Sequence, residues 1–146
     1  MRLTQCATDD ICQAESGAQI DLEIRDLPRR LDKVYEEIHR RSPAAKVLAT
    51  GYLPLIKRGE TCPYIEKIPA SDREWLARSI ERINQAVREA AERNGAIYVL
   101  ADAALDHTAC SPSPWVDFTG QETNSFPMHP THAGQVAMAK ALRAAL

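Results

Sequence analysis

Two short apolar runs of residues, separated by a long amphipathic stretch, place the strongest constraint on how this chain can fold. Residues 46–52 read K-V-L-A-T-G-Y and residues 96–100 read A-I-Y-V-L, so each run is apolar on both faces and has the length of a strand. Strands buried on both faces are typical of parallel sheets that are covered by helices. The order helix, strand, helix, strand, helix therefore predicts an α/β fold with a parallel sheet.

The first helix is predicted from a stripe of apolar residues before residue 46. These residues recur with helical spacing at Ile20, Ile24, Leu27, Leu31, Val34, Tyr35 and Ile38. Pro28 is costly inside a helix but is tolerated in a first turn, so we expect the helix to start near Leu27 and to end before Ser42 and Pro43. Residues 1–17 are polar without a clear period and are predicted to be a loop.

Two further helices follow. Ser71 and Glu74 have the spacing of a capping box at the start of a second apolar stripe that includes Trp75, and Asn94 with Gly95 predicts its end. An alanine-rich segment, residues 133–146, predicts a closing helix. Two strands are few for a buried parallel sheet, so we expect either a partner that completes the sheet or a longer chain.

Length and charge narrow the function classes. The chain has 146 residues, which fits one domain, and its 26% charged residues give a net charge of only −2. Basic residues are interspersed with acidic ones, so we expect no nucleic-acid partner. No apolar run is long enough to span a bilayer, and the first residues lack the apolar core of a secretory signal.

The four cysteines favour disulfide bonds. They have no C-x-x-C pair and no matching histidine spacing, which argues against zinc, and neither a metal nor a cofactor is expected. Of the three possible connectivities we favour Cys6 with Cys12 and Cys62 with Cys110, because the first pair is close in sequence and the second lies in two predicted loops. Disulfides indicate an oxidising compartment, so the protein is expected to be exported; four reduced thiols are the alternative.

The segment S-F-P-M-H-P-T-H-A-G-Q, residues 125–135, contains the main candidate for chemistry. Pro127 and Pro130 bias the residues before them, Phe126 and His129, toward extended backbone, and place His129 where a loop turns into the last helix. An imidazole titrates near neutral pH and can accept and return a proton. The alternative is a histidine that caps the helix or fills a polar gap.

Several other side chains have competing interpretations. His132 is expected on the surface of the last helix, although a metal centre of His107, His129 and His132 is a weaker alternative. His107 and Asp102 are expected to tie down the long loop of residues 103–128. Trp75 is predicted to be in the core, and Trp115 either lines a substrate cleft or covers a disulfide.

Four segments together resemble a known family. H-P-T-H-A-G-Q, L-P-R-R-L-D-K-V, K-V-L-A-T-G-Y-L-P-L and D-H-T-A-C-S-P-S-P-W-V are similar to the carboxyl-terminal half of the SGNH hydrolases, also called GDSL lipases and esterases. The closest match is the secreted, disulfide-containing actinobacterial type. The resemblance implies a three-layer α/β/α sandwich of the flavodoxin-like kind, incomplete at the N-terminus, with residues 1–146 as the carboxyl-terminal portion of one SGNH domain. The four cysteines fall where that group has its second and third disulfides.

The resemblance also implies roles for individual residues. His129 matches the catalytic histidine of the last conserved block of the family. That block usually has an aspartate three residues earlier, where this chain has Phe126. Some secreted members orient the histidine with a main-chain carbonyl, so the carbonyl of Phe126 is predicted to take that role. Asp117 is an alternative partner if the loop folds back, although a solvated loop carboxylate is the expected state.

The nucleophile block of the family is absent from these residues. No G-D-S or G-x-N-D segment occurs, and Ser125, the serine nearest to His129, is separated from it by a proline-containing extended segment. We therefore expect a carboxylic ester hydrolase that acts on a small-molecule or lipid ester, with the nucleophile and the export signal in a missing N-terminal half. The alternative is a non-catalytic remnant or a binding module that needs a partner to complete its sheet.

Overall fold

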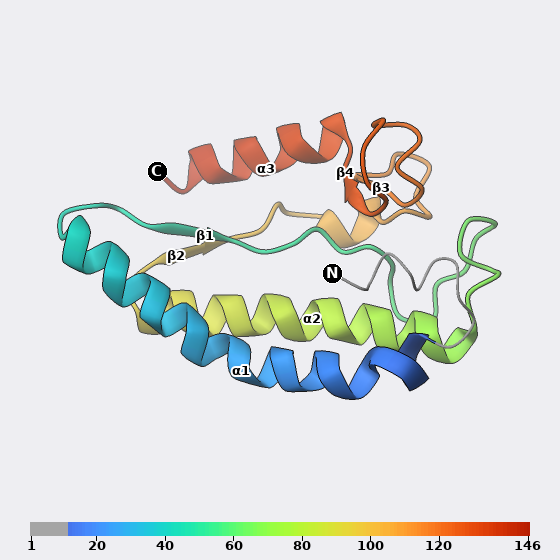
Figure 1. The fold of residues 1–146 in the computed structure, drawn as a ribbon. Helices are drawn as coiled ribbons and strands as arrows, with labels where there is room; N and C mark the ends of the chain where they lie inside the picture. The colour runs from blue at the N-terminus through green and yellow to red at the C-terminus, as the bar shows by residue number, and fades with distance from the viewer. Residues whose placement is uncertain (1–11) are drawn as a thin grey trace.

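A two-stranded parallel sheet lies between two layers of helices in the computed structural model, which describes residues 12–146 (Figure 1). The helices are α1 (Cys12–Arg41), α2 (Ala70–Arg93) and α3 (His132–Ala144), and the paired strands are β1 (Leu48–Thr50) and β2 (Ile97–Val99). Leu48 is in register with Ile97 and Thr50 with Val99. Helices α1 and α2 cover one face and α3 covers the other, so the predicted three-layer α/β/α arrangement is confirmed.

Helix α1 is longer than predicted. It begins at Cys12, so the predicted start near Leu27 is wrong, as is the loop expected over residues 12–17; residues 1–11 lie outside the described part. Pro28 is inside the helix, and α1 changes direction along its length in Figure 1, as expected for an interior proline. Packing against α2 on both sides of Pro28 offsets its cost, because Ile24 and Tyr35 are both buried.

Ion pairs join α1 and α2 on both sides of the proline. Arg82 of α2 pairs with Asp21, and Arg93 of α2 pairs with Asp32 at 2.9 Å. The four side chains are partly exposed, so each pair stabilises the fold by little on its own. The two pairs fix the register of the helices, whereas the buried apolar stripe provides most of the stability.

Helix α2 has the predicted end and a different start. It ends at Arg93, and Gly95 follows with a left-handed φ of 71°, as expected. The predicted capping box is wrong, because the helix starts at Ala70 after Pro69 and no side chain caps it. The carbonyl of Pro69 instead accepts hydrogen bonds from the backbone N–H groups of Asp72 and Arg73, each at 3.0 Å. The first turn therefore begins at Ala70, one residue before Ser71.

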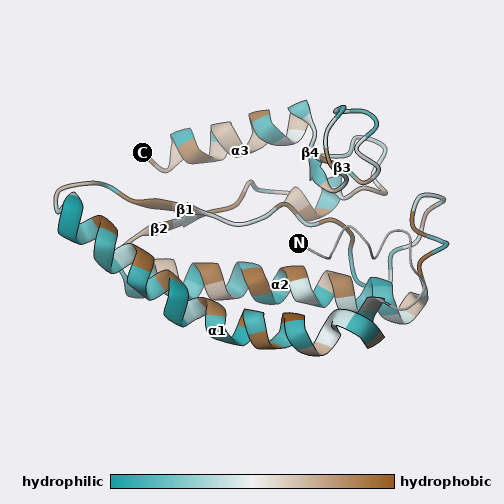
Figure 2. Cartoon of the chain, viewed as in Figure 1, coloured by the Kyte–Doolittle hydropathy of each residue, from teal (hydrophilic) through white to brown (hydrophobic). Residues whose placement is uncertain are grey.

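The core lies mainly between α2 and the loops that follow β1 and β2. Figure 2 shows hydrophobic β1 and alternating hydrophobic and hydrophilic stretches along α1 and α2, the pattern of helices that cover one face of a sheet. Trp75 is 4% exposed, so its predicted core position is confirmed. The largest side chains that are almost fully buried are Ile65, Leu76 and Val116. A smaller cluster joins α1, α2 and the sheet and contains Tyr35, Ala49, Ala90, Ala91 and Ala96.

A disulfide bond joins the loops that follow the two strands. Cys62, in the loop after β1, is bonded to Cys110, in the loop after β2, with their Cα atoms 5.7 Å apart. The predicted Cys62–Cys110 bridge is therefore confirmed, and the predicted Cys6–Cys12 bridge lies outside the described residues. Both loops leave the carboxyl ends of parallel strands, the edge where α/β proteins form their sites.

Candidate active site

His129 is presented by a short antiparallel ladder directly before α3. Strand β3 (Val116–Asp117) pairs with β4 (His129–Pro130), with Asp117 opposite His129. The N–H of Met128 donates to the Asp117 carbonyl at 2.7 Å, which holds the segment just before the histidine. His129 is thus extended at a loop-to-helix junction, as predicted.

The start of α3 is locked to the same ladder. The hydroxyl of Thr131 accepts from the N–H of Gly134 at 3.2 Å and donates to the Pro114 carbonyl at 3.0 Å. A Cβ atom on Gly134 would lie 2.3 Å from the carbonyl oxygen of Trp115, so only glycine lets α3 approach β3 this closely. The ladder and the helix therefore fix the backbone on both sides of His129.

The His129 ring contacts a different carbonyl from the one predicted. Its Nδ1 lies 3.3 Å from the carbonyl oxygen of Pro127, and not of Phe126 as the sequence led us to expect. Met128 has a left-handed φ of 69°, and the Pro127 carbonyl that precedes it lies beside Nδ1. A carbonyl only accepts, so Nδ1 is the donor and Nε2 keeps its lone pair. The Phe126 side chain is 76% exposed, with its ring centroid 6.3 Å from that of His129.

The Asp117 side chain is buried, and within residues 12–146 its carboxylate makes no hydrogen bond to the His129 ring. Its side chain is 5% exposed, so the expected solvated state is wrong. Among the described residues, its carboxylate accepts hydrogen bonds from the backbone N–H groups of Thr119, Gly120 and Thr123 in the neighbouring loop. Burial on its own raises the pKa of this carboxyl, but the hydrogen bonds from Thr123, Gly120 and Thr119 outweigh it and hold the pKa below the ordinary value.

The other polar candidates lie apart from His129. The Nδ1 atom of His107 lies 2.8 Å from the Ser113 carbonyl, and its ring stacks on Trp115 with centroids 4.0 Å apart, so His107 holds the loop as expected. His132 is exposed in the first turn of α3. Within residues 12–146, no three or more His, Cys, Asp or Glu side chains gather as a metal site requires, which leaves the alternative centre with His107, His129 and His132 unsupported.

Two serines lie near histidines in the sequence or in the structure. The backbone N–H of Ser125 donates to the Gly120 carbonyl at 3.1 Å, and within the described part of the chain its hydroxyl makes no hydrogen bond to His129. The Ser113 hydroxyl lies 3.2 Å from His107 Nδ1, a contact that the sequence analysis did not foresee. That nitrogen already donates to the Ser113 carbonyl, so it has no lone pair to accept the hydroxyl proton.

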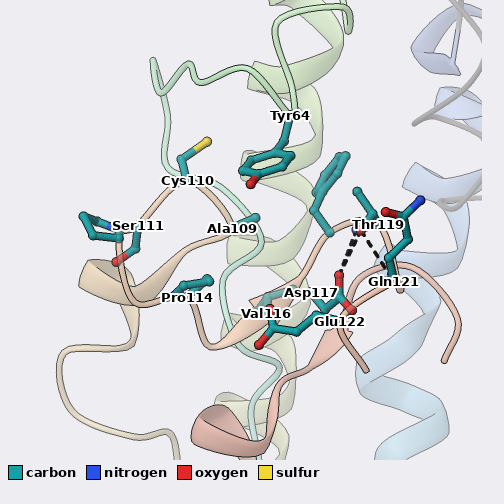
Figure 3. A pocket seen from close by; sticks show the side chains of 12 residues that line it. Tyr64, Ala109, Cys110, Ser111, Pro114, Val116, Asp117, Thr119, Gln121 and Glu122 are labelled. Atoms are coloured by element: carbon teal, nitrogen blue, oxygen red, sulfur yellow. Dashed lines mark hydrogen bonds between the residues drawn. The ribbon is translucent and has the colours of Figure 1, made fainter. Parts of the chain in front are cut away.

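A pocket of about 720 Å³ opens beside β3 (Figure 3). Its walls come from the loop after β1, the Cys110 part of the loop after β2, β3 itself and the loop after β3. The lining residues are Tyr64, Ala109, Cys110, Ser111, Pro112, Pro114, Val116, Asp117, Phe118, Thr119, Gln121 and Glu122. None of them is Lys, Arg or His, and this volume is within the range of small-molecule sites. Trp115 stacks on His107 instead of lining this pocket.

No helix in the described part of the chain has both the length and the apolar character needed to cross a membrane.

Known proteins resemble this chain in sequence and in fold. It is 32% identical to a lipase of Streptomyces rimosus over 111 residues, which cover 75% of this chain and 40% of the relative. It is 30% identical to Lipase 2 of Streptomyces coelicolor over 153 residues, which cover 94% of this chain and 52% of the relative. The chain therefore spans about half the length of these relatives or less.

Two solved structures share the fold. The extracellular lipase of Streptomyces rimosus superposes with a TM-score of 0.78 at 26% identity, over 97% of this chain and 63% of that one. Phospholipase A1 from Streptomyces albidoflavus NA297 also gives 0.78, at 24% identity and over 61% of its length, a likeness of fold alone. The model of the GDSL-like lipase/acylhydrolase family matches residues 4–137. This match covers most of the 146 residues, so the chain belongs to the GDSL-like lipase/acylhydrolase family.

Proposed function

We propose that this chain supplies the general base of a serine carboxylic ester hydrolase of the SGNH type, and that His129 is this base. A serine hydroxyl attacks the ester carbonyl carbon while Nε2 of His129 accepts its proton, and the imidazolium then protonates the leaving alcohol. Water, deprotonated by the same nitrogen, releases the acid from the acyl-serine. The observation that carries the proposal is the contact between Nδ1 and the Pro127 carbonyl, which leaves Nε2 available as the base.

The serine and the oxyanion donors are proposed to come from polypeptide outside residues 1–146. No G-D-S or G-x-N-D segment occurs in the chain, and its curated relatives are about twice as long. In this proposal residues 1–146 are the carboxyl-terminal portion of one SGNH domain. A base without a nucleophile and an oxyanion hole loses most of what acyl transfer requires, so the chain alone is expected to be inactive.

The substrate is proposed to be an uncharged carboxylic ester in an extracellular setting. The pocket beside β3 is lined by both polar and apolar residues and by no cationic side chain, which suits an uncharged acyl or alcohol group better than a phosphate. The strand that borders this pocket is paired with the strand that carries His129. The Cys62–Cys110 bridge supports an oxidising compartment, as does the likeness to an extracellular lipase.

The test begins with the coding DNA upstream of Met1, which should contain G-D-S and G-x-N-D in frame. The polypeptide read from that longer frame is then assayed for hydrolysis of p-nitrophenyl butyrate. His129→Ala should lower kcat by about 10² to 10⁴-fold, because it removes the general base. His132→Ala is the matched control, since this histidine is exposed three residues away, and it should retain wild-type activity.

Two results would overturn the proposal. One is hydrolysis by His129→Ala at the rate of His132→Ala. The other is an upstream sequence without G-D-S, in which case the non-catalytic alternative, a remnant or binding module completed by a partner, accounts for the chain better.

A further inference from the structure

The loop that precedes His129 is folded around one buried carboxylate. Oδ1 of Asp117 accepts from the backbone N–H groups of Thr119 at 3.1 Å and Gly120 at 2.8 Å, and from the Thr119 hydroxyl at 3.2 Å. Oδ2 accepts from the N–H of Thr123 at 2.8 Å and from its hydroxyl at 3.0 Å. Three backbone groups of one loop thus depend on a single side chain.

The far end of the loop returns to the same place. The N–H of Ser125 donates to the Gly120 carbonyl at 3.1 Å, so residues 120–125 form a closed turn. Gly120 has a φ of 77°, and a Cβ atom there would lie 2.3 Å from the Ser125 carbonyl oxygen. The N–H of Met128 then reaches the main-chain carbonyl of Asp117 at 2.7 Å. Asp117 therefore holds the loop at its start through its side chain and at its end through its backbone.

The orientation of the His129 ring depends on the end of this loop. The residue is exposed, and Nδ1 of its ring hydrogen-bonds to the carbonyl of Pro127, two residues earlier in the chain. The Pro127 carbonyl is aimed by the left-handed Met128, whose N–H is held by Asp117. A displacement of residues 119–128 would move the carbonyl away from Nδ1 without touching the imidazole itself.

From this chain of contacts we infer that Asp117 is a positioning residue for His129, acting through the backbone of residues 119–128 and not by contact with the imidazole. In the described residues the Asp117 carboxylate has no hydrogen bond to His129, which separates this role from that of a carboxylate paired directly with a catalytic histidine. The inference rests on the proposed function only in that His129 is the base. The feature it explains is a catalytic histidine block that has Phe126 where an acid is expected.

The test is the tautomer of His129 in the 146-residue chain, with no substrate. Ring ¹⁵N chemical shifts are recorded at a pH about two units above the ordinary imidazole pKa of roughly 6.5, with His129→Gln used to assign the signals. The wild type should favour the Nδ1–H tautomer about fivefold, the effect of one ordinary hydrogen bond. Asp117→Asn, which replaces one acceptor oxygen by a donor, should bring that preference toward unity.

Two further variants complete the design. Asp106→Asn makes the same chemical change at an exposed carboxylate that pairs with Lys57, and it should leave the tautomer ratio of His129 at the wild-type value. Thr123→Val removes only one of the five hydrogen bonds that the Asp117 carboxylate accepts and should give a smaller change in the direction of Asp117→Asn. Thr123→Val decides the question if Asp117→Asn does not fold.

A wild-type tautomer ratio in folded Asp117→Asn would overturn the inference, as would a wild-type ratio in Thr123→Val if Asp117→Asn does not fold. Because the readout uses neither a nucleophile nor an ester, it is independent of the proposed function. An active His129→Ala enzyme would remove the catalytic role of the histidine and leave the measured coupling between Asp117 and its ring unchanged.

Discussion

The Asp117 carboxylate gives up its proton more readily than an ordinary aspartate because donors from its own loop surround the charged form. Burial opposes this effect and is the largest single influence on its pKa, yet the bonds from Thr123, Gly120 and Thr119 together outweigh it. A pKa that is lower in the folded than in the unfolded chain means that ionised Asp117 stabilises the fold above the unfolded pKa. That contribution is lost as the pH falls through the folded pKa.

We therefore expect the stability effect of Asp117→Asn to depend on pH. Near neutral pH the variant should lower the free energy of unfolding by about 1 to 3 kcal/mol, because buried N–H donors lose an acceptor. As the pH falls below an unfolded pKa of roughly 3.9 and then through the lower folded pKa, the difference from the wild type should shrink, since first the unfolded chain and then the folded carboxyl binds a proton. Urea unfolding at a series of pH values measures it, and a difference that stays constant at acidic pH would contradict the assignment.

At the scale of the elements, the disulfide fixes two loops that have no strand pairing between them. Cys62 and Cys110 are separated by 48 residues, so the bridge closes a long loop in the unfolded chain. The chain-entropy model gives a stabilisation of roughly 4 kcal/mol for a loop of this size. The pocket beside β3 is lined by Cys110 and Tyr64, so the same bridge also holds two of its walls together.

The double variant Cys62→Ser with Cys110→Ser should lower the free energy of unfolding by about 4 kcal/mol. Guanidinium unfolding of the oxidised proteins measures this loss, and Cys6 and Cys12 are the same in both. Treatment with dithiothreitol should bring the wild type close to the variant. A variant as stable as the oxidised wild type would show that the native loops, not the bridge, hold this edge.

Sequence reasoning succeeded for the elements with a clear period and failed where tertiary contacts decide. The apolar runs located β1 and β2, and the alanine-rich segment located α3. The predicted burial of both strand faces is wrong among the described residues, because Ile97 is 39% exposed and Thr50 is exposed as well. The start of α1 was missed because burial of Ile24 on the N-terminal side of Pro28 outweighs the cost of an interior proline. No local pattern carries that information.

The candidate site shows the same division. The extended position of His129 before the last helix was predicted from its prolines, but the carbonyl beside its ring was missed by one residue. The cause is the positive φ of Met128, which is uncommon for a residue of this type and was not signalled by a glycine. The burial of Asp117 was missed because it depends on a loop that folds back over its carboxylate.

At the scale of the whole molecule, the parallel sheet of the described residues has only two strands. Among the described residues β1 pairs only with β2, so the outer backbone groups of both strands have no strand partner there. Unpaired edges are templates for further strands. If the chain is the carboxyl-terminal portion of a longer domain, as proposed, those edges are where the remainder joins it.

Hydrogen exchange tests this view of the sheet. In the polypeptide read from the longer frame, the backbone amides of residues 48–50 or 97–99 should exchange about tenfold more slowly than in the 146-residue chain. This is the effect of roughly 1.4 kcal/mol in the free energy of opening. The amides of α3 serve as the reference, because α3 packs against β4 within this chain. Equal exchange at both strands in the two proteins would place the remaining polypeptide elsewhere.

The Cys62–Cys110 bond also divides the molecule by covalent connectivity. The bond closes a ring that contains α2 and β2, while His129 and α3 lie outside it. A protease that cuts once inside the ring leaves a single joined molecule. A cut among the exposed residues Glu122, Asn124 or Ser125 releases His129 and α3 from any covalent tie to the sheet. A single cut in the loop of Asp117 would therefore detach the proposed base, His129, even though the bridged core remained intact.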